Sequence, residues 1–431
     1  MILLAHPTGN QFVRQLLAKL QAEQSLGLFA TTLGFPESSR WPGRLSRDLA
    51  RRCYPVPSER LWTQPWRETV RLLAGKAGAH RLVRHETGWA SVDAVYRHLD
   101  HRVAAKLEGW GKQFELDVVY GYEDGCAETL AEAQRLRLRR VYDLPIAYWE
   151  TSRRWLDEEA VRWPAWEPTL GGTSDSPAKL ARKTRELELA EIVVCPSRFV
   201  VESLPAWARD SKKIVLAPFG SPEIEIQESR FKSEEQEARH QELLAPSSKL
   251  QTPNSSAKLR VLFAGSMSQR KGLADVFAAM RLLGRTDIEL VVMGTPVVPM
   301  EFYRREYADF IHEPTRPHAE VLRLMRSCDV LVLPSIVEGR ALVMQEAMSQ
   351  GLPIIITPNT GGADLIDEGR TGFLVPVRSP DKIAEKIAWC AEHRAEVRAM
   401  DTAVRAKAAA YTWAGYARII VGTITETSGQ G

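Results

Sequence analysis

The clearest strand, loop and helix in succession are residues 259–283, LRVLFAGSMSQRKGLADVFAAMRLL. The apolar run Arg260–Ala264 ends at a glycine, which predicts a buried strand. Apolar residues at helical spacing follow from Leu273 to Leu283 and predict a helix. A strand that leads through a short loop into a helix is the first half of a βαβ unit. This stretch therefore predicts a parallel sheet covered by helices.

The same alternation continues downstream and also occurs upstream. Downstream we expect strands at 288–293, 310–311, 330–334 and 353–357, and helices at 319–326 and 341–350. Upstream we expect a strand at the N-terminus, helices at 11–23 and 128–137, and strands at 116–120, 140–142, 192–195 and 214–217. Two such series predict an α/β protein with two Rossmann-like, doubly wound domains. The carboxyl ends of their strands should face a common cleft, where open α/β sheets bind ligands.

The length supports two domains, because 431 residues exceed what one compact core usually holds. We place the N-terminal domain at 1–221 and the C-terminal domain at 259–405. Residues 222–258 are rich in Glu, Gln, Ser, Lys and Pro, which predicts a polar linker with a short helix at 234–244. Residues 380–420 suggest two helices, the last carrying Tyr411, Trp413 and Tyr416. We expect 406–431 to form a C-terminal helix that packs back on the N-terminal domain.

Composition excludes several classes of protein. No window approaches the roughly 18 apolar residues of a membrane span, and no signal peptide precedes the first strand, so we expect a cytoplasmic protein. The five cysteines are odd in number, scattered and without a Cys-x-x-Cys pair, which predicts reduced thiols. No Asp-x-Asp and no His and carboxylate cluster at metal-ligand spacing occurs, so we expect neither a metal nor another cofactor.

Basic residues are concentrated at 40–84, which holds eleven Arg or Lys against three acids although the net charge is only +3. Trp41, Trp62 and Trp66 lie among these charges. The segment could meet anionic lipid headgroups, an acidic acceptor or a nucleic acid, or it could be a solvated helical face. We expect peripheral contact with the inner face of an anionic membrane, and no nucleic acid.

The first candidate site is the loop Gly265–Gly272, between the predicted strand and helix. Such a loop presents backbone amides and a helix start beside two adjacent cations, Arg270 and Lys271. These groups suit a diphosphate, and they would stabilise it as a leaving group without a metal. A solvated surface turn is the alternative.

Two further clusters follow predicted strands. Glu338 stands in a loop after the strand at 330–334, and Glu346 falls two turns into the next helix. Their carboxylates could accept hydrogen bonds from the paired hydroxyls of a ribose or hexose. A helix-start acid and an exposed helical residue are the alternatives. After the strand at 353–357, Gly361 and Gly362 would let a ligand approach the backbone, or would form a plain turn.

Together these residues resemble family 4 of the retaining glycosyltransferases, which have the GT-B fold. The resemblance is carried by Phe263–Gly272, by the Glu-x7-Glu pair, and by Gly361-Gly362 followed by Thr371–Pro376. It implies a nucleotide-diphospho-sugar donor, UDP- or GDP-linked, and a hydroxyl acceptor. It also implies that a terminal helix containing Trp413 and Tyr416 crosses back onto the first domain.

By this resemblance, Arg270 and Lys271 would hold the donor diphosphate, Glu346 the ribose, and Glu338 the sugar hydroxyls, with Glu338, Lys271 and Arg270 in the catalytic roles. The loop at His312 would meet the base, and Gly9 would lie in the loop after the first strand. The remaining donor-side candidates are Gly265, Ser266, Gly339, Arg340, Ala341, Leu342, Gly361 and Gly362. The acceptor-side candidates are His6, Asn10, Tyr122, Glu123 and Asp124.

The sequence departs from the family pattern at three places. Ser266 stands where many relatives have a second phosphate-contacting arginine, and Arg340-Ala341 replaces the usual Phe-Gly. Tyr122 stands where relatives often carry a histidine. Arg340 could offset the cation missing at Ser266 or recognise an acidic sugar.

Two other functions remain open. One is a nucleotide-sugar 2-epimerase of the same fold, which product analysis with and without acceptor would distinguish. The other is a catalytically inactive partner subunit that binds the nucleotide without turnover.

Overall fold

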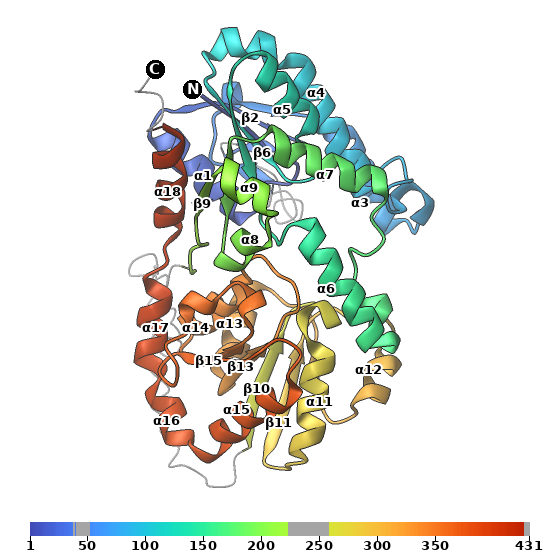
Figure 1. Cartoon of the computed structure of the whole chain (residues 1–431), viewed down its shortest axis with the longest axis vertical. Coiled ribbons are helices and arrows are strands. Elements are labelled where there is room, and N and C mark those ends of the chain that lie inside the picture. The colour runs from blue at the N-terminus through green and yellow to red at the C-terminus, as the bar shows by residue number, and fades with distance from the viewer. Residues whose placement is uncertain (38, 40–51, 223–257, 426–431) are drawn as a thin grey trace.

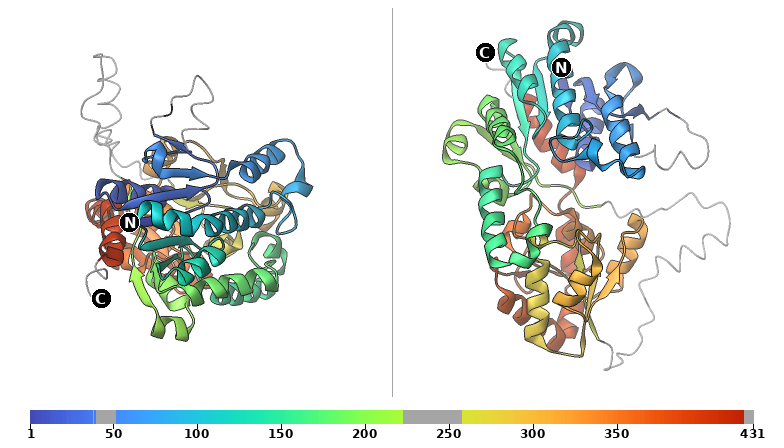
Figure 2. Two further views of the ribbon diagram at one scale, coloured as in Figure 1. Left: turned by 90° about the horizontal axis from the view of Figure 1, so that it is seen from above. Right: turned by 90° about the vertical axis from the view of Figure 1, so that its right-hand side faces the viewer.

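The computed structural model describes residues 1–37, 39, 52–222 and 258–425, arranged as two α/β domains along the long axis (Figure 1). The predicted linker at 222–258, its helix at 234–244 and the basic residues at 40–51 lie outside the described residues, apart from Pro222 and Lys258. Figure 2 shows the two domains from two further directions.

The N-terminal sheet has seven strands in the order β5-β2-β1-β6-β7-β8-β9, all parallel. The bounds in that order are Leu61–Thr63, Leu26–Thr31, Ile2–Ala5, Val118–Tyr122, Arg139–Asp143, Ile192–Cys195 and Lys213–Leu216. Two short strands, β3 (Phe35–Pro36) and β4 (Cys53–Tyr54), pair separately. The chain reverses the direction of its winding between β1 and β6, so the loops after these strands adjoin at the domain's ligand-binding position.

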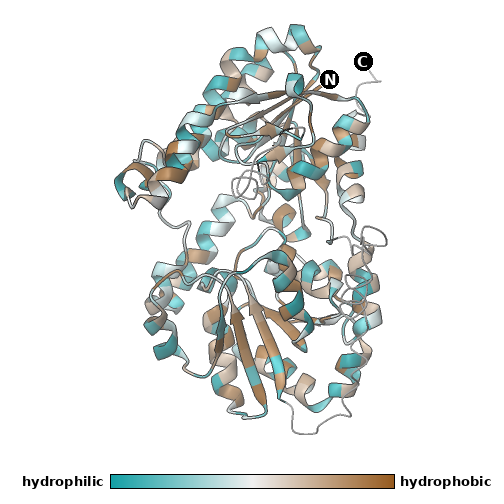
Figure 3. Ribbon diagram, turned by 180° about the vertical axis from the view of Figure 1, so that it is seen from behind, coloured by the Kyte–Doolittle hydropathy of each residue, from teal (hydrophilic) through white to brown (hydrophobic). Residues whose placement is uncertain are grey.

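The C-terminal sheet has six parallel strands in the order β12-β11-β10-β13-β14-β15. Their bounds are Ile311–Glu313, Ile288–Met293, Leu259–Ala264, Val330–Leu333, Ile354–Ile356 and Gly372–Leu374. This is the strand order of a Rossmann domain, with the switch of direction between β10 and β13. The inner strands β10, β11, β13 and β14 are mostly apolar, as the colours of Figure 3 show, and mostly buried, whereas the edge strand β12 is partly exposed.

Helices cover both faces of the N-terminal sheet. Ile2 and Leu4 of β1 face a core shared with α1 (Gln11–Ala22) and the terminal helix α18 (Trp413–Thr425). Leu3 and Ala5 point to the other face, as strand geometry requires. That face is covered by α4 (Val92–Phe114), α5 (Ala127–Arg135), α7 (Pro177–Leu189), α8 (Arg198–Ser203) and α9 (Ala206–Ser211), while α3 (Pro65–Lys76) follows β5.

The C-terminal domain has its own helices. The two that pack side by side are α11 (Leu273–Leu283) and α15 (Pro380–Glu392), and α14 (Leu342–Ser349) contacts both β13 and α17 (Asp401–Ala409). The remaining helices are α12 (Met300–Glu306), α13 (His318–Arg326) and α16 (Arg394–Ala399). The predicted fold class, two doubly wound domains across a cleft, is confirmed.

One segment of the N-terminal half packs into the C-terminal domain, which the sequence did not predict. Helix α6 (Trp149–Arg162) leaves the N-terminal sheet after β7, and the 3₁₀ helix η3 (Pro164–Thr169) follows it (Figure 1). Trp166 of η3 is 1% exposed and belongs to the C-terminal core. Arg162 donates two hydrogen bonds to Asp275 of α11, at 3.0 and 2.6 Å. We call residues 149–170 the strap.

The tail also differs from the prediction. Residues 380–425 form four helices instead of two, and Tyr411 precedes the last of them instead of lying within it. Alanine-rich stretches such as 401–409 have no glycine or proline at their ends. The sequence therefore did not show where one helix ends and the next begins. Helix α18 packs on the N-terminal core, whereas residues 401–409 pack on α14 of the C-terminal domain.

Candidate active site

The site of the C-terminal domain lies at its switch point, where the loops after β10 and β13 pack together. Gly272 has a φ of +81°, and a Cβ there would lie 2.1 Å from the carbonyl oxygen of Pro334. The backbone amide of Ile336 donates to the carbonyl of Arg270 at 2.9 Å. These contacts hold the short helix η4 (Gln269–Lys271) against the loop that contains Glu338.

The three residues predicted to be catalytic meet in one cluster. Glu338 accepts a hydrogen bond from Arg270 Nη1 at 2.7 Å, and Lys271 Nζ lies 2.5 Å from the same oxygen, Oε1. Burial would raise the pKa of Glu338, but the charges of Lys271 and Arg270 outweigh burial and hold that pKa below its ordinary value. Burial lowers the pKa of Lys271, and the charge of Glu338 opposes that change.

This cluster can exchange one anion for another. Two side-chain cations converge on one buried carboxylate, so a diphosphate that entered would find both within reach of its oxygens. The carboxylate keeps the cations in place while no such anion is bound.

The Glu338 loop also touches the N-terminal domain. Ala147 donates its backbone N–H to the carbonyl of Glu338 at 3.3 Å, and Ser197 Oγ donates to the carbonyl of Gly339 at 2.5 Å. A Cβ on Gly339 would lie 1.7 Å from the carbonyl oxygen of Pro145, and one on Gly361 would lie 1.9 Å from that of Gly339. Gly339 therefore allows the two domains to pack closely, and Gly361 allows close packing of two loops within the C-terminal domain.

Arg340 has a different setting from the one that the sequence suggested. Its side chain is fully buried, donates to Asp364 at 2.7 and 3.0 Å and to Gln345 at 3.0 Å, and lies over the ring of Tyr411. Gln345 in turn donates to the carbonyl of Phe219 at 2.8 Å. These contacts tie the loop to the tail and to the end of the N-terminal domain, so they give no support to a role for Arg340 in replacing the cation at Ser266 or binding an acidic sugar.

The other donor-side candidates are spread around the same sheet edge. Glu346 does not join the cation pair; its Oε1 lies 3.7 Å from His318 Nδ1, and burial raises its pKa. His312 lies in β12, and its Nε2 is 3.0 Å from the carbonyl oxygen of Gly294, the residue that follows β11. Ser266 Oγ contacts Ser268 Oγ at 3.2 Å. Ala341 and Leu342 begin α14, and Gly362 packs against Met344.

On the N-terminal side, His6 lies after β1 and Tyr122 ends β6, at that domain's switch point. His6 Nδ1 accepts hydrogen bonds from the amides of Thr8 and Gly9, at 3.1 and 2.8 Å, so Nε2 carries the proton. Burial lowers the pKa of His6 to about 3, which keeps the ring neutral. Its ring centroid is 4.1 Å from that of Tyr122, and Nε2 has no partner among the described residues.

Gly9 and Asn10 have local roles. A Cβ on Gly9, whose φ is +55°, would lie 2.1 Å from the ring of Tyr54, so its missing side chain makes room for that tyrosine. Asn10 precedes α1 and accepts a hydrogen bond from Thr8 Oγ1 at 3.2 Å. These contacts explain both residues without a ligand.

Glu123 and Asp124 meet a row of basic residues on α7 that the sequence analysis did not single out. Glu123 Oε1 lies 3.2 Å from Lys183 Nζ, and Asp124 pairs with Arg182 at 2.6 Å and with Lys179 at 3.2 Å. The spacing of these three bases puts them on one helical face, which was the only signal of them in the sequence. Asp124 therefore pairs with two bases, whereas Glu123 pairs with one, Lys183.

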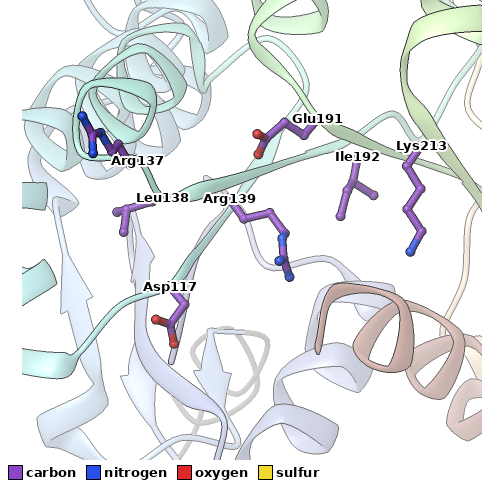
Figure 4. A pocket seen from close by; sticks show the side chains of 7 residues that line it. All are labelled: Asp117, Arg137, Leu138, Arg139, Glu191, Ile192 and Lys213. Carbon is purple, nitrogen blue, oxygen red and sulfur yellow. The ribbon is translucent and has the colours of Figure 1, made fainter. Parts of the chain in front are cut away.

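A cavity of about 290 Å³ joins the two halves of the site. It extends from Glu123 and Lys183 to Arg270 and is walled by the start of the strap. A larger hollow of about 400 Å³ lies at the amino-terminal ends of β7, β8 and β9 (Figure 4). Those ends are opposite the cleft, and Arg139 there donates to the carbonyl of Ile424 at 2.6 Å, so this hollow adjoins the end of α18.

Three potential metal ligands meet near the cavity, although no sequence spacing suggested them. His85 Nε2 lies 3.2 Å from Glu86 and 3.1 Å from Asp175. Asp175 also pairs with Lys179 at 3.0 Å, and Glu86 accepts from the amide of Ser176 at 2.9 Å. Lys179 thus already neutralises Asp175, and the amide of Ser176 already donates to Glu86.

Glu186 holds the loop after β6 and gives a testable pH dependence. It is fully buried, accepts hydrogen bonds from the amides of Asp124 and Cys126 at 2.7 and 3.0 Å, and burial raises its pKa from 4.5 to about 8. The folded protein therefore keeps a proton that the unfolded chain has lost, and this contribution to stability disappears as the pH rises from 4.5 through 8. We expect Glu186→Gln to become progressively more stable than the wild type as the pH rises from 5 to 9.

Urea unfolding at a series of pH values measures this difference. Glu188→Gln, which changes an exposed carboxylate on the same helix, is the control and should follow the wild type. A constant difference between Glu186→Gln and the wild type across this range would contradict a proton on Glu186.

The arrangement of the two α/β domains identifies the fold class of this protein. Solved structures that it resembles over the whole chain include the sucrose-phosphate synthase from Thermosynechococcus elongatus (16% identity, 99% of this chain and 98% of that one, TM-score 0.64) and Anabaena HepE in complex with UDP (14%, 99% and 99%, 0.57). At such identities the likeness shows the fold alone, and it is the GT-B fold of glycosyltransferases.

Sequence comparison then narrows the relationship. Residues 258–393 match the family described as Glycosyl transferases group 1. The D-inositol 3-phosphate glycosyltransferase of Paenarthrobacter aurescens is 30% identical over 138 residues, 30% of this chain and 34% of that protein. The amylovoran biosynthesis glycosyltransferase AmsK of Erwinia amylovora is 24% identical over 313 residues, 69% of this chain and 66% of that protein. The matches to the first curated relatives span between about a third and a half of their length.

Proposed function

We propose that this protein is a retaining, metal-independent glycosyltransferase of family 4. It would move a hexose from a UDP- or GDP-linked donor to a hydroxyl acceptor. The observation that carries the proposal is the buried cluster of Arg270, Lys271 and Glu338 at the switch point of the C-terminal domain, beside the cavity that leads to the N-terminal domain. The match of residues 258–393 to a glycosyltransferase family supports it.

In this mechanism the donor diphosphate takes the place of Glu338 between the two cations. As the bond from the sugar to the diphosphate breaks, negative charge grows on the leaving oxygen, and Arg270 and Lys271 stabilise that charge. Glu338, released from the cations, accepts hydrogen bonds from the sugar hydroxyls. Retention requires the acceptor hydroxyl to attack from the face that the leaving group departs, so the leaving phosphate can accept its proton.

The other candidate residues would bind the ribose, the base and the acceptor. Glu346 in α14 would accept hydrogen bonds from the ribose, and the chain near His312, at the end of β12, would meet the base. His6, an acceptor-side candidate, stays neutral, and its Nε2–H would orient the acceptor hydroxyl. The neutral ring donates without adding charge, which suits a sugar hydroxyl.

Nucleotide binding tests the donor site. We expect UDP or GDP to raise the melting temperature by several degrees at about 100 times the dissociation constant, because binding at that level contributes about 2.7 kcal/mol. The expected shift is the same with EDTA as with Mg²⁺. The corresponding monophosphate is the control, since it lacks the diphosphate that the cations bind. A shift that disappears in EDTA would contradict metal independence, and no shift with any nucleoside diphosphate would contradict the donor site.

We also propose that the protein contacts an anionic membrane peripherally through the basic segment 40–84, of which residues 52–84 are described, and through the residues that follow it. Residues 66–92 expose an unusual set of large apolar side chains: Trp66 (75%), Leu72, Leu73 (60%), Leu82, Trp89 (50%) and Val92. Exposed bases, Arg81 and Arg84, lie among them, and Arg67 covers the ring of Trp89. Apolar side chains next to bases suit the interface of an anionic bilayer. No helix in the described part of the chain is long and apolar enough to cross a membrane.

A vesicle sedimentation assay tests this surface. We expect the wild type to bind vesicles of phosphatidylcholine with phosphatidylglycerol, and to bind much less at high salt or without the anionic lipid. Trp66→Glu combined with Leu73→Glu should lower this binding at least about tenfold. Both changes replace an apolar side chain that would enter the bilayer interface by a carboxylate that the anionic lipid repels. Trp207→Glu, at an exposed tryptophan on α9, is the control. Equal binding of all three proteins would contradict the proposed surface.

A further inference from the structure

The cavity between the domains has the size of a small ligand. Its volume of about 290 Å³ is near the lower end of the roughly 300–1,000 Å³ of ligand pockets, which leaves room for one or two sugar rings. Glu123, after β6, forms its N-terminal side, and Arg270 forms its C-terminal side. A ligand in the cavity would therefore lie against the cation cluster that is proposed to hold the donor.

The charges on the N-terminal side of the cavity cancel. Lys183 lies between Glu123 and Asp175, with Nζ to oxygen distances of 3.2 and 3.7 Å. Lys179 behind it pairs with Asp175 at 3.0 Å and with Asp124 at 3.2 Å. Arg153 lies 3.8 Å from Asp157 and donates to the carbonyl of Asp175 at 3.3 Å. Each cation that lines this side already has a carboxylate.

The C-terminal side offers no spare cation either. Arg270 and Lys271 share Glu338, and under the proposed function the donor diphosphate takes them over. A phosphate on the acceptor would then lie beside another anion and lose its water without gaining a positive partner. Such an uncompensated charge in a partly buried place is strongly unfavourable.

The other lining groups suit an uncharged sugar. Trp149 and Leu156 give an apolar wall, against which the C–H face of a sugar ring can pack. Ser152 contributes a hydroxyl to the same wall. The carboxylate of Glu123, which lines the cavity and has one basic partner, can accept a hydrogen bond from a sugar hydroxyl. Few polar groups placed on an apolar surface are typical of ligand sites.

We infer that this cavity is the acceptor subsite and that it selects an uncharged sugar unit of one or two rings over a sugar phosphate. The inference rests on the proposed function and specifies its acceptor. An acceptor hydroxyl oxygen forms the new bond to the anomeric carbon while the bond from that carbon to the diphosphate breaks. The hydroxyl proton passes to the leaving phosphate oxygen, and the nucleoside diphosphate departs.

Calorimetric titration tests the selectivity. The probes are methyl glucoside, galactoside and mannoside, each compared with the corresponding hexose 6-phosphate, on the free protein and on protein saturated with UDP or GDP. We expect at least one neutral glycoside to bind, and its phosphorylated counterpart to bind at least about tenfold more weakly with the nucleotide present, since an unpaired charged group costs more than one hydrogen bond.

Two variants locate the binding. Glu123→Gln should weaken the neutral glycoside about tenfold, by removing a charged acceptor. Because that change also leaves Lys183 without one partner, Ser152→Tyr provides a second variant: it fills the cavity without breaking an ion pair and should abolish glycoside binding while nucleotide binding persists. Glu150→Tyr puts the same bulk on an exposed position of α6 and should bind like the wild type.

The outcomes separate this inference from the proposed function. Hexose phosphates that bind as tightly as the glycosides would overturn it, as would unchanged glycoside affinity in Ser152→Tyr. Nucleotide binding without binding of any glycoside would also overturn it. Glycoside binding in the absence of any nucleotide binding would support the cavity and refute the donor site instead.

Discussion

Lys271→Ala is expected to lower kcat/KM for sugar transfer by about 10²–10³-fold. Its ammonium group lies 2.5 Å from Glu338 and both side chains are mostly buried, so water would replace the ammonium poorly as charge develops on the diphosphate. Arg270 alone would then have to balance Glu338 and the donor. Initial rates at varied donor concentration measure the loss.

The matched control is Lys382→Ala. Lys382 is half-exposed on α15 and pairs with Glu385, far along the chain from the cluster, so its rate should equal that of the wild type. Circular dichroism and melting temperature would establish that both variants fold. A Lys271→Ala enzyme within threefold of the wild type would remove the central element of the mechanism.

Trp166→Ala is expected to destabilise the protein by about 3–5 kcal/mol, as truncation of a buried aromatic side chain does. The indole packs at ring-centroid distances of 5.0 Å from Phe302, 5.7 Å from Tyr303 and 5.8 Å from Phe277, all in the C-terminal domain. The loss should therefore appear in the unfolding of that domain, although Trp166 comes from the N-terminal half of the sequence. Urea unfolding followed by hydrogen exchange would show which domain is affected.

Trp207→Ala is the control, because Trp207 is 42% exposed on α9 and should cost far less. Equal destabilisation by the two variants, or a loss confined to the N-terminal sheet, would contradict the assignment of the strap to the C-terminal core. The strap also supports the catalytic loop: Glu159 accepts from Gln269 Nε2 at 2.6 Å, and Thr169 accepts from the Gln269 amide at 3.0 Å.

The C-terminal domain was the most predictable part of the fold. The helix at 273–283 and the strand at 288–293 have the predicted bounds, because apolar periodicity and glycine boundaries are local properties of the chain. Strand β2 (Leu26–Thr31) was not predicted, since a run so near a preceding helix lacks a turn signal that separates the two. That the end of the strap packs into the C-terminal core was not predicted, because a mostly polar helix such as α6 does not reveal its partner.

The site shows the same division. Local sequence alone was enough to identify the loop with Arg270 and Lys271 and the loop with Glu338, each directly after a buried strand. Only the tertiary structure decided that these loops meet. Their contact depends on β10 and β13 being neighbours in the sheet, although 65 residues lie between the end of β10 and the start of β13. It likewise decided that Arg340 turns to the tail, that Gly9 makes room for Tyr54, and that the bases of α7 neutralise Glu123 and Asp124. The periodicity of apolar residues depends only on residues close together in the sequence. The partner of a charged side chain depends on the order of the strands in the sheet.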